Sequence, residues 1–253
     1  MINLSILLLI PLATALLVLI CSTAAQIRMV ALLGSVAQLG YSSLIMLDYV
    51  SQRAAGNKAQ MLYESRHSWF SSLNIEYYVG ADGISVAMIM LTAVVVMTGI
   101  LISWNVEKMA KEFFFLIVLL SLGAYGFFIS LDLFTMFFFL EVAVIPKFLL
   151  IGIWGSGKKE YSAMKLALML MGGSALVLIG FLFLYFNTNT GSGAHTFDLL
   201  KIVQMHIPVA AQQFIFPLMF VGFGVFTAMF PFHTWAADGH SSAPTAASMF
   251  LAG

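Results

Sequence analysis

The stretch FFFLEVAVIPKFLLIGIWG, from Phe137 to Gly155, decides the fold. It places one acid, Glu141, and one base, Lys147, in a run of otherwise apolar residues. Such a run has the length of a membrane-spanning helix, which needs ~20 mostly apolar residues. The stretch therefore predicts a helix that crosses a bilayer with two ionisable side chains inside it.

Composition extends this prediction to the whole chain. Of its 253 residues, 61% are hydrophobic and 9% are charged, whereas soluble domains are ~45–50% apolar and ~25% charged. We therefore expect an integral membrane protein in contact with the lipid bilayer. The formal net charge is zero, so nothing indicates a surface for nucleic acid. A single cysteine, Cys21, excludes an iron–sulfur cluster or a cysteine-cluster metal site built from this chain alone, and we expect no cofactor in it.

Apolar runs predict an all-α membrane protein, a polytopic transmembrane bundle of about seven helices plus the start of an eighth. The runs cover residues 2–21, 29–48, 84–104, 113–131, 133–153, 162–187 and 214–235, and the eighth begins at Ala246. Its short length suggests the front part of a longer protein. The first run has no basic n-region and no small-residue cleavage site, so we expect a retained helix. We divide the chain into residues 1–112, with three helices and an outer loop, and residues 113–253.

Lysine and arginine in the short loops predict the orientation, because cytoplasmic loops carry an excess of them. Loops after the odd-numbered runs hold Arg28, Lys108, Lys111, Lys158 and Lys159, whereas the loop after the fourth run holds only Asp132. Two long polar segments, residues 51–83 and 187–213, separate the second run from the third and the sixth from the seventh. We therefore expect the N-terminus and both of these segments outside. The second of these segments contains TFDLLKIVQ, residues 196–204, a short amphipathic turn suited to the membrane interface.

Glu141 is the first candidate functional residue. It lies ~12 Å from the outer end of its predicted helix, where an ionised side chain costs ~2.5–3.5 kcal/mol on insertion scales. Pro146 has no N–H, so the carbonyl of Val142 loses its helical donor and creates a place for water. These features favour a proton-path acid. The alternative is a protonated or salt-bridged residue that only holds two helices together.

Two lysines are candidate partners. Lys147 lies about 240° round the helix from Glu141, so the two need not pair directly. Its side chain leans toward the membrane centre, although a position at the inner interface remains an alternative. Lys165 lies about one turn from the cytoplasmic start of its helix. It can either extend to the interface or share a polar pathway with Glu141.

The run at 214–235 carries signs of a broken helix. Pro231 should interrupt it, and His233 follows as a candidate proton relay because its pKa lies near neutrality. The alternative is an interface histidine beside Trp235. His233 and His240 lack further ligands at metal-binding spacing. No phosphate loop, nucleotide fingerprint or catalytic triad stands out.

Three motifs together resemble one family. They are YYVGADGISVAMIMLT (Tyr77–Thr92), FFLEVAVIPKFLLIGIWG (Phe138–Gly155) and MFPFHTWAADGHSSAPTAASMFLAG (Met229–Gly253). In order and spacing they are similar to the antiporter-like proton-pumping subunits of respiratory complex I, NADH-quinone oxidoreductase, in particular the subunit M family.

The resemblance implies the N-terminal half of an antiporter-like fold, with a broken seventh helix and inverted repeats. Glu141 matches the family's proton-path glutamate, Lys165 matches its helix-six lysine, and His233 begins its HTWLPDAH block. It further implies proton pumping in a bacterial inner (plasma) membrane beside other antiporter-like membrane subunits. NADH and quinone would act at partner subunits that carry FMN and iron–sulfur clusters.

Two departures from the family pattern stand out. Phe226 occupies the place of the family's helix-seven lysine, and Lys147 stands where relatives usually have an uncharged residue. One hypothesis is that Lys147 replaces the missing base. The alternatives are a subunit of a sodium/proton antiporter complex or membrane-bound hydrogenase, and a structural paralogue that does not pump.

Overall fold

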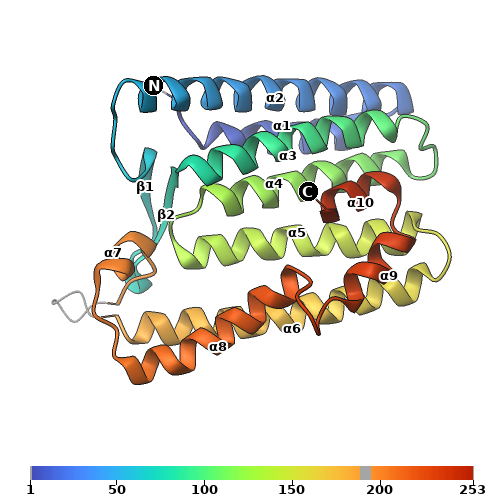
Figure 1. Ribbon diagram of the computed structural model, residues 1–253. Helices are drawn as coiled ribbons and strands as arrows, with labels where there is room; N and C mark the ends of the chain where they lie inside the picture. Colours follow the sequence, from blue (N-terminus) through green and yellow to red (C-terminus); the bar gives the residue numbers. More distant parts are fainter. Residues whose placement is uncertain (1, 189–194, 253) are drawn as a thin grey trace.

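The computed structural model describes residues 2–188 and 195–252. Its long helices lie side by side and run alternately in opposite directions (Figure 1). The helices are α1 (Ile6–Ile20), α2 (Ala24–Ala54), α3 (Gly83–Ile102), α4 (Ala110–Ile129), α5 (Leu133–Trp154), α6 (Lys159–Phe186), α7 (Leu199–Gln204), α8 (Val209–Phe226), α9 (Thr234–Ser242) and α10 (Thr245–Ala252).

The seven predicted spans all appear as helices. Within the described residues, six helices are long and apolar enough to cross a membrane, namely α2, α3, α4, α5, α6 and α8, and α1 is apolar but shorter. Helix α2 begins five residues before the predicted run because Thr23 caps it. The Thr23 hydroxyl accepts from the Gln26 N–H, and the Gln26 side chain accepts from the Thr23 N–H. The predicted polytopic bundle is confirmed.

The predicted break in the seventh span is also confirmed. Helix α8 ends at Phe226, the backbone turns through Ala228 with a positive φ of 52°, and α9 begins after His233. From α9 the chain turns back along the bundle as α10, which packs beside α3 (Figure 1). The predicted eighth helix, from Ala246, therefore corresponds to α10 and begins one residue earlier.

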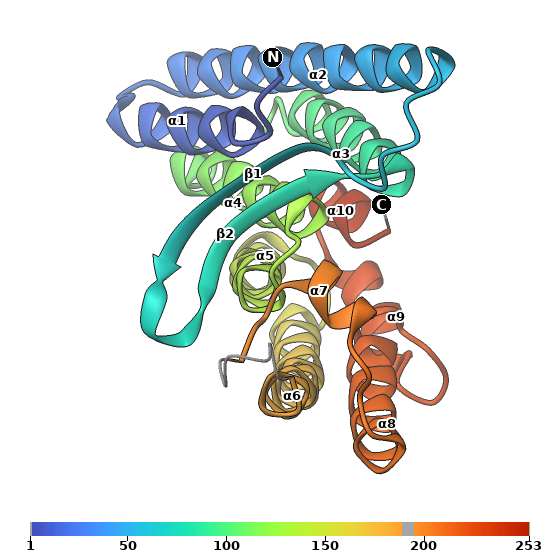
Figure 2. The same ribbon diagram turned by 90° about the vertical axis from the view of Figure 1, so that its left-hand side faces the viewer.

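Within the described residues, a β-hairpin departs from the all-α prediction. Strands β1 (Leu62–Phe70) and β2 (Ile75–Ala81) pair antiparallel, and Asn74 turns the chain in the left-handed region with a φ of 50°. The hairpin lies across one end of the bundle (Figure 2). The sequence predicts only a polar loop here, because residues 62–70, LYESRHSWF, do not alternate between apolar and polar.

Arg66 fixes the hairpin to the α6–α8 connection. It donates to Glu76 at 2.8 Å and to Asp198 at 2.7 Å, and Asp198 caps α7 through the N–H groups of Leu200 and Lys201. Asp132 joins the same end by capping α5. Burial raises the pKa of the Asp132 carboxyl above its usual value. The hairpin end of the bundle is thus held by charged and capping contacts between segments far apart in sequence.

Candidate functional site

Helix α5 carries both ionisable residues of the opening stretch. It starts at the Asp132 cap, runs without interruption through Pro146, and ends at Trp154. It lies between α4 and α6 (Figure 1). Glu141 and Lys147 are separated by ~9 Å along the helix axis, and they project from different sides of it.

Glu141 lies on the side of α5 that packs against α6 and α8. It shares this stripe with Phe137, Val144 and Phe148, and those three pack in apolar clusters with residues of α6 and α8. The Oε1 atom of Glu141 is buried and has no hydrogen-bond partner among the described residues. An unpartnered carboxyl oxygen in a membrane interior is costly, so this atom is suited to bind a proton or water.

Lys147 lines a cavity on another side of α5 from Glu141. The cavity has a volume of about 170 Å³ and lies among α3, α4, α5 and α10, and its lining includes Thr92, Gly123, Phe250 and Lys147. No described carboxylate forms an ion pair with Lys147. The residue also lies ~10 Å before the end of α5 at Trp154. This placement fits a buried base better than an interface residue, and its role stays a prediction.

Lys165 is paired with Asp238, for which the sequence predicts no separate role. Its Nζ lies 2.6 Å from Asp238 Oδ2 on α9, and its ammonium stands 5.6 Å from the Tyr161 ring centroid. The side chains of Lys165 and Asp238 are 24% and 41% exposed. Lys165 thus joins α6 to the segment after the helix break. Its extension to the interface and its share in a polar pathway with Glu141 both stay predictions.

His233 lies at the N-terminal boundary of α9. Its side chain is exposed, and its ring stacks on Phe230 with centroids 5.6 Å apart. Nothing in the described residues brings it to Glu141. Its relay role therefore stays a prediction without a contact in its support.

Hydrogen bonds between uncharged groups hold the chain at the helix break. Trp235 Nε1 donates to the Val225 carbonyl at 2.8 Å, and the Ser162 and Ser242 hydroxyls lie 2.8 Å apart. Phe226 packs in the apolar cluster that contains Val144 of the Glu141 stripe. An aromatic ring of α8 therefore lies in the same cluster as this stripe.

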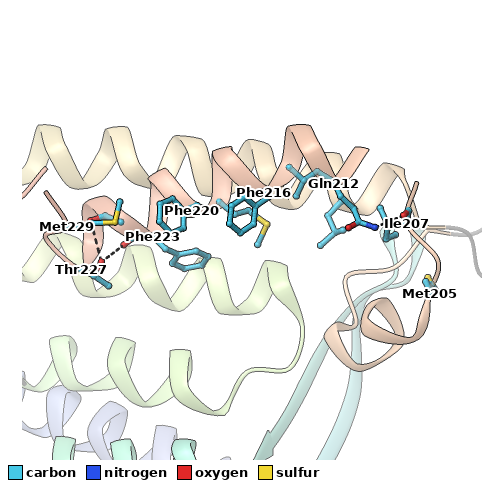
Figure 3. Close-up of a pocket in the computed structure, with 12 residues that line it drawn as sticks. Met205, Ile207, Gln212, Phe216, Phe220, Phe223, Thr227 and Met229 are labelled. Carbon is cyan, nitrogen blue, oxygen red and sulfur yellow. Dashed lines mark hydrogen bonds between the residues drawn. The ribbon is translucent and has the colours of Figure 1, made fainter. Parts of the chain in front are cut away.

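A wide apolar groove runs along α8 (Figure 3). It has a volume of about 610 Å³, and the residues labelled in the figure include Phe216, Phe220, Phe223 and Met229. Among its described lining residues the polar side chains are those of Gln212 and Thr227, which donate to the carbonyls of Ile207 and Phe223. With no ionisable side chain among these described residues, the groove is suited to apolar contact.

No group of three or more histidine, cysteine or acidic side chains in residues 2–188 and 195–252 could hold a metal ion.

Comparison with known proteins gives consistent matches. The family model "NADH:quinone oxidoreductase/Mrp antiporter, TM" matches residues 130–253. NADH-quinone oxidoreductase subunit M of Rickettsia conorii is 34% identical over 88% of this chain and 44% of its own length. A chain 4 of NAD(P)H-quinone oxidoreductase from Picosynechococcus is 36% identical over 74% of this chain and 34% of its own length. The chain thus spans less than half the length of these relatives.

Solved structures share the fold. A chain of respiratory complex I from Thermus thermophilus matches with a TM-score of 0.82 and 20% identity, over 98% of this chain and 49% of that one. A chain of the Mrp complex from Dietzia matches with a TM-score of 0.79 and 17% identity, over 98% of this chain and 26% of that one.

Proposed function

Because the chain belongs to the NADH:quinone oxidoreductase/Mrp antiporter membrane-subunit family, we propose that it translocates protons as part of an NADH-quinone oxidoreductase. NADH oxidation and quinone reduction take place in partner subunits that hold FMN and iron–sulfur clusters. This chain contributes no redox group, in keeping with its single cysteine. Its immediate partners are other antiporter-like membrane subunits.

The observation that carries the proposal is the buried Oε1 atom of Glu141, which has no partner among the described residues. A carboxyl group in this setting changes its charge when a nearby cation arrives or leaves. Intramembrane acids of this kind line proton relays in pumps and transporters. Glu141 therefore takes up a proton and releases it as charge moves in the surrounding helices.

Lys147 supplies a second ionisable group on the same helix, a cation that tunes the charge of Glu141. Its cavity of about 170 Å³ is large enough for water. Glu141 and Lys147 are too far apart along α5 for a direct hydrogen bond, since ~9 Å separates their positions. Pro146 lies between them and leaves the Val142 carbonyl without a helical donor. Water can donate a hydrogen bond to that carbonyl on a path between the Glu141 and Lys147 sides of α5.

The orientation follows from the two ends of the bundle. The α1–α2, α3–α4 and α5–α6 connections gather at one end, and the hairpin and α7 lie at the other (Figure 1). The first end carries the basic residues Arg28, Lys108, Lys111, Lys158 and Lys159, which lie in these connections or in the adjoining helix turns. We place that end in the cytoplasm and the hairpin end outside a bacterial inner membrane.

The second candidate is a subunit of an Mrp-type antiporter, supported by the shared fold with the Dietzia chain. Ion uptake into vesicles that hold the whole complex distinguishes the NADH-quinone oxidoreductase from the antiporter complex. We expect NADH to drive internal acidification in sodium-free buffer, and a protonophore to abolish it. Acidification that requires sodium, or that NADH cannot drive, would favour the antiporter complex instead.

Replacing Lys147 with methionine is expected to lower the proton flux through this subunit by about tenfold, less than the loss of a directly transferring group. The measurement is the ratio of internal acidification to NADH oxidation. Removal of a half-buried charge with no carboxylate partner among the described residues should leave thermal stability unchanged or raised. Lys158→Met, at an exposed loop position, is the control. Equal ratios in the two variants would remove Lys147 from the pathway.

A further inference from the structure

Basic side chains gather at the end of the bundle opposite the hairpin, where the α1–α2 turn meets the α3–α4 connection (Figure 1). Arg28 Nη2 donates to the Val106 carbonyl at 3.2 Å. Lys111 Nζ donates to the Leu19 carbonyl, at the end of α1, at 3.1 Å. Lys108 is an exposed residue of the same connection. Arg28, Lys108 and Lys111, here named the basic corner, take no part in the proposed proton path.

The cations of the basic corner have no acidic partner among the described residues. Glu107 and Glu112 are their neighbours in the chain, but both are exposed, and three cations against two acids leave an excess of one positive charge. The hairpin end differs, because Arg66 and Lys201 both form ion pairs with Asp198 there. The basic corner therefore has the charge to hold an anion that the described chain does not supply.

The hydrogen-bond donors of the basic corner are only partly used. The Arg28 guanidinium has five N–H donors, and the Val106 carbonyl is its one acceptor among the described residues. Its Nε atom is buried and has no acceptor there. The Lys111 ammonium also meets one described acceptor, the Leu19 carbonyl. Phosphate oxygens suit such donors, since charge-assisted hydrogen bonds are roughly twice as strong as neutral ones.

An apolar stripe on α1 leads to the basic corner. Leu12, Leu16 and Leu19 follow at helical spacing, and all three side chains are exposed. The stripe ends at Leu19, whose carbonyl accepts the hydrogen bond from Lys111. Exposed apolar surface of this kind marks contact with a membrane or a partner. A surface suited to acyl chains thus adjoins a surface suited to a phosphate.

We propose that the basic corner binds the phosphate of an anionic phospholipid whose acyl chains lie along the α1 stripe. Basic groups between spanning helices on the cytoplasmic side bind headgroups of this kind, and the corner lies at the end that we place in the cytoplasm. The stripe favours a lipid over inorganic phosphate, because a free phosphate ion gains nothing from an apolar surface. The lipid site does not depend on Glu141 or Lys147.

Photocrosslinking tests the site in the whole complex. The complex is placed in phosphatidylcholine nanodiscs with a small amount of one photoreactive lipid, either phosphatidylglycerol or phosphatidylcholine, both with the same diazirine-bearing acyl chain. After illumination, mass spectrometry measures the lipid attached to the α1 peptide. We expect about fivefold more labelling by phosphatidylglycerol, since one basic residue near a membrane surface attracts an anionic lipid by about this factor. Equal labelling by the two lipids would overturn the proposal.

Two double variants locate the preference for phosphatidylglycerol. Arg28→Gln with Lys111→Gln should bring the two labelling levels together, although glutamine can still donate to the same carbonyls. Lys158→Gln with Lys159→Gln is the matched control, because both lysines lie at the same end and Lys159 Nζ donates to the Ile153 carbonyl at 3.0 Å. The control should keep the preference. Loss of the preference in both variants would assign it to the general charge of this end and reject the site.

Inorganic phosphate distinguishes a lipid site from a site for the free ion. We expect the preference of the α1 peptide for phosphatidylglycerol to be the same in phosphate buffer as in chloride of equal ionic strength. If phosphate abolishes the preference and chloride does not, the basic corner binds the free ion and the lipid assignment is wrong.

Discussion

Replacing Glu141 with glutamine is expected to lower the proton flux carried by this subunit by about a hundredfold, as the loss of a positioned proton-transfer group typically does. Glutamine has nearly the same shape, but its amide neither takes up nor releases a proton at physiological pH. The buried Oε1 position then keeps an acceptor and loses the switch in charge. The ratio of internal acidification to NADH oxidation, in vesicles that hold the whole complex, measures the effect.

Glu160→Gln is the matched control, because Glu160 is an exposed acid in the first turn of α6. We expect it to keep the ratio of the unmodified complex. Assembly of both variant complexes is checked on native gels, so that a missing subunit is not read as lost pumping. If a fully assembled Glu141→Gln complex pumps at the normal ratio, the chain is a structural paralogue and Glu141 only holds helices together.

Helix periodicity was enough to predict part of this site. The angle of about 240° between Glu141 and Lys147 predicts different sides of one helix, and Lys147 lines a cavity whose described lining does not include Glu141. The long apolar runs likewise predicted the spanning helices, because hydropathy acts over a whole segment. These inferences succeed because they depend on local geometry.

Contacts between segments far apart in the chain could not be predicted from the sequence. The partner of Lys165 is Asp238, 73 residues later, and only the return of α9 onto α6 brings them together. Arg66 and Asp198 are separated by 132 residues and meet at the end of the bundle. The hydrogen bond from Gln38 Nε2 to the Leu7 carbonyl was missed for another reason. A hydropathy average over an apolar segment does not register a single amide side chain. The Leu7 carbonyl lacks its helical donor because of Pro11, which lies on a different helix from Gln38.

Replacing Gly123 with leucine is expected to destabilise the subunit by about 3 kcal/mol or more, because overpacking at a site that cannot relax reaches this range. A Cβ atom at Gly123 would lie 2.8 Å from the backbone nitrogen of Ala143 and 2.9 Å from the carbonyl oxygen of Phe139. Both are main-chain atoms of α5, so no side-chain rotation relieves the clash. Membrane helices depend on such small residues for close approach.

The measurement is the thermal stability of the purified complex and the amount of the subunit in membranes. Gly172→Leu is the control, because a Cβ atom at Gly172, also on a spanning helix, meets nothing within 4 Å. We expect a lower melting temperature for Gly123→Leu alone. An equal change in both variants would mean that α4 and α5 are not in close contact at Gly123. Since Gly123 also lines the Lys147 cavity, separation of these helices would open that cavity toward lipid, so loss of stability and loss of pumping should appear together.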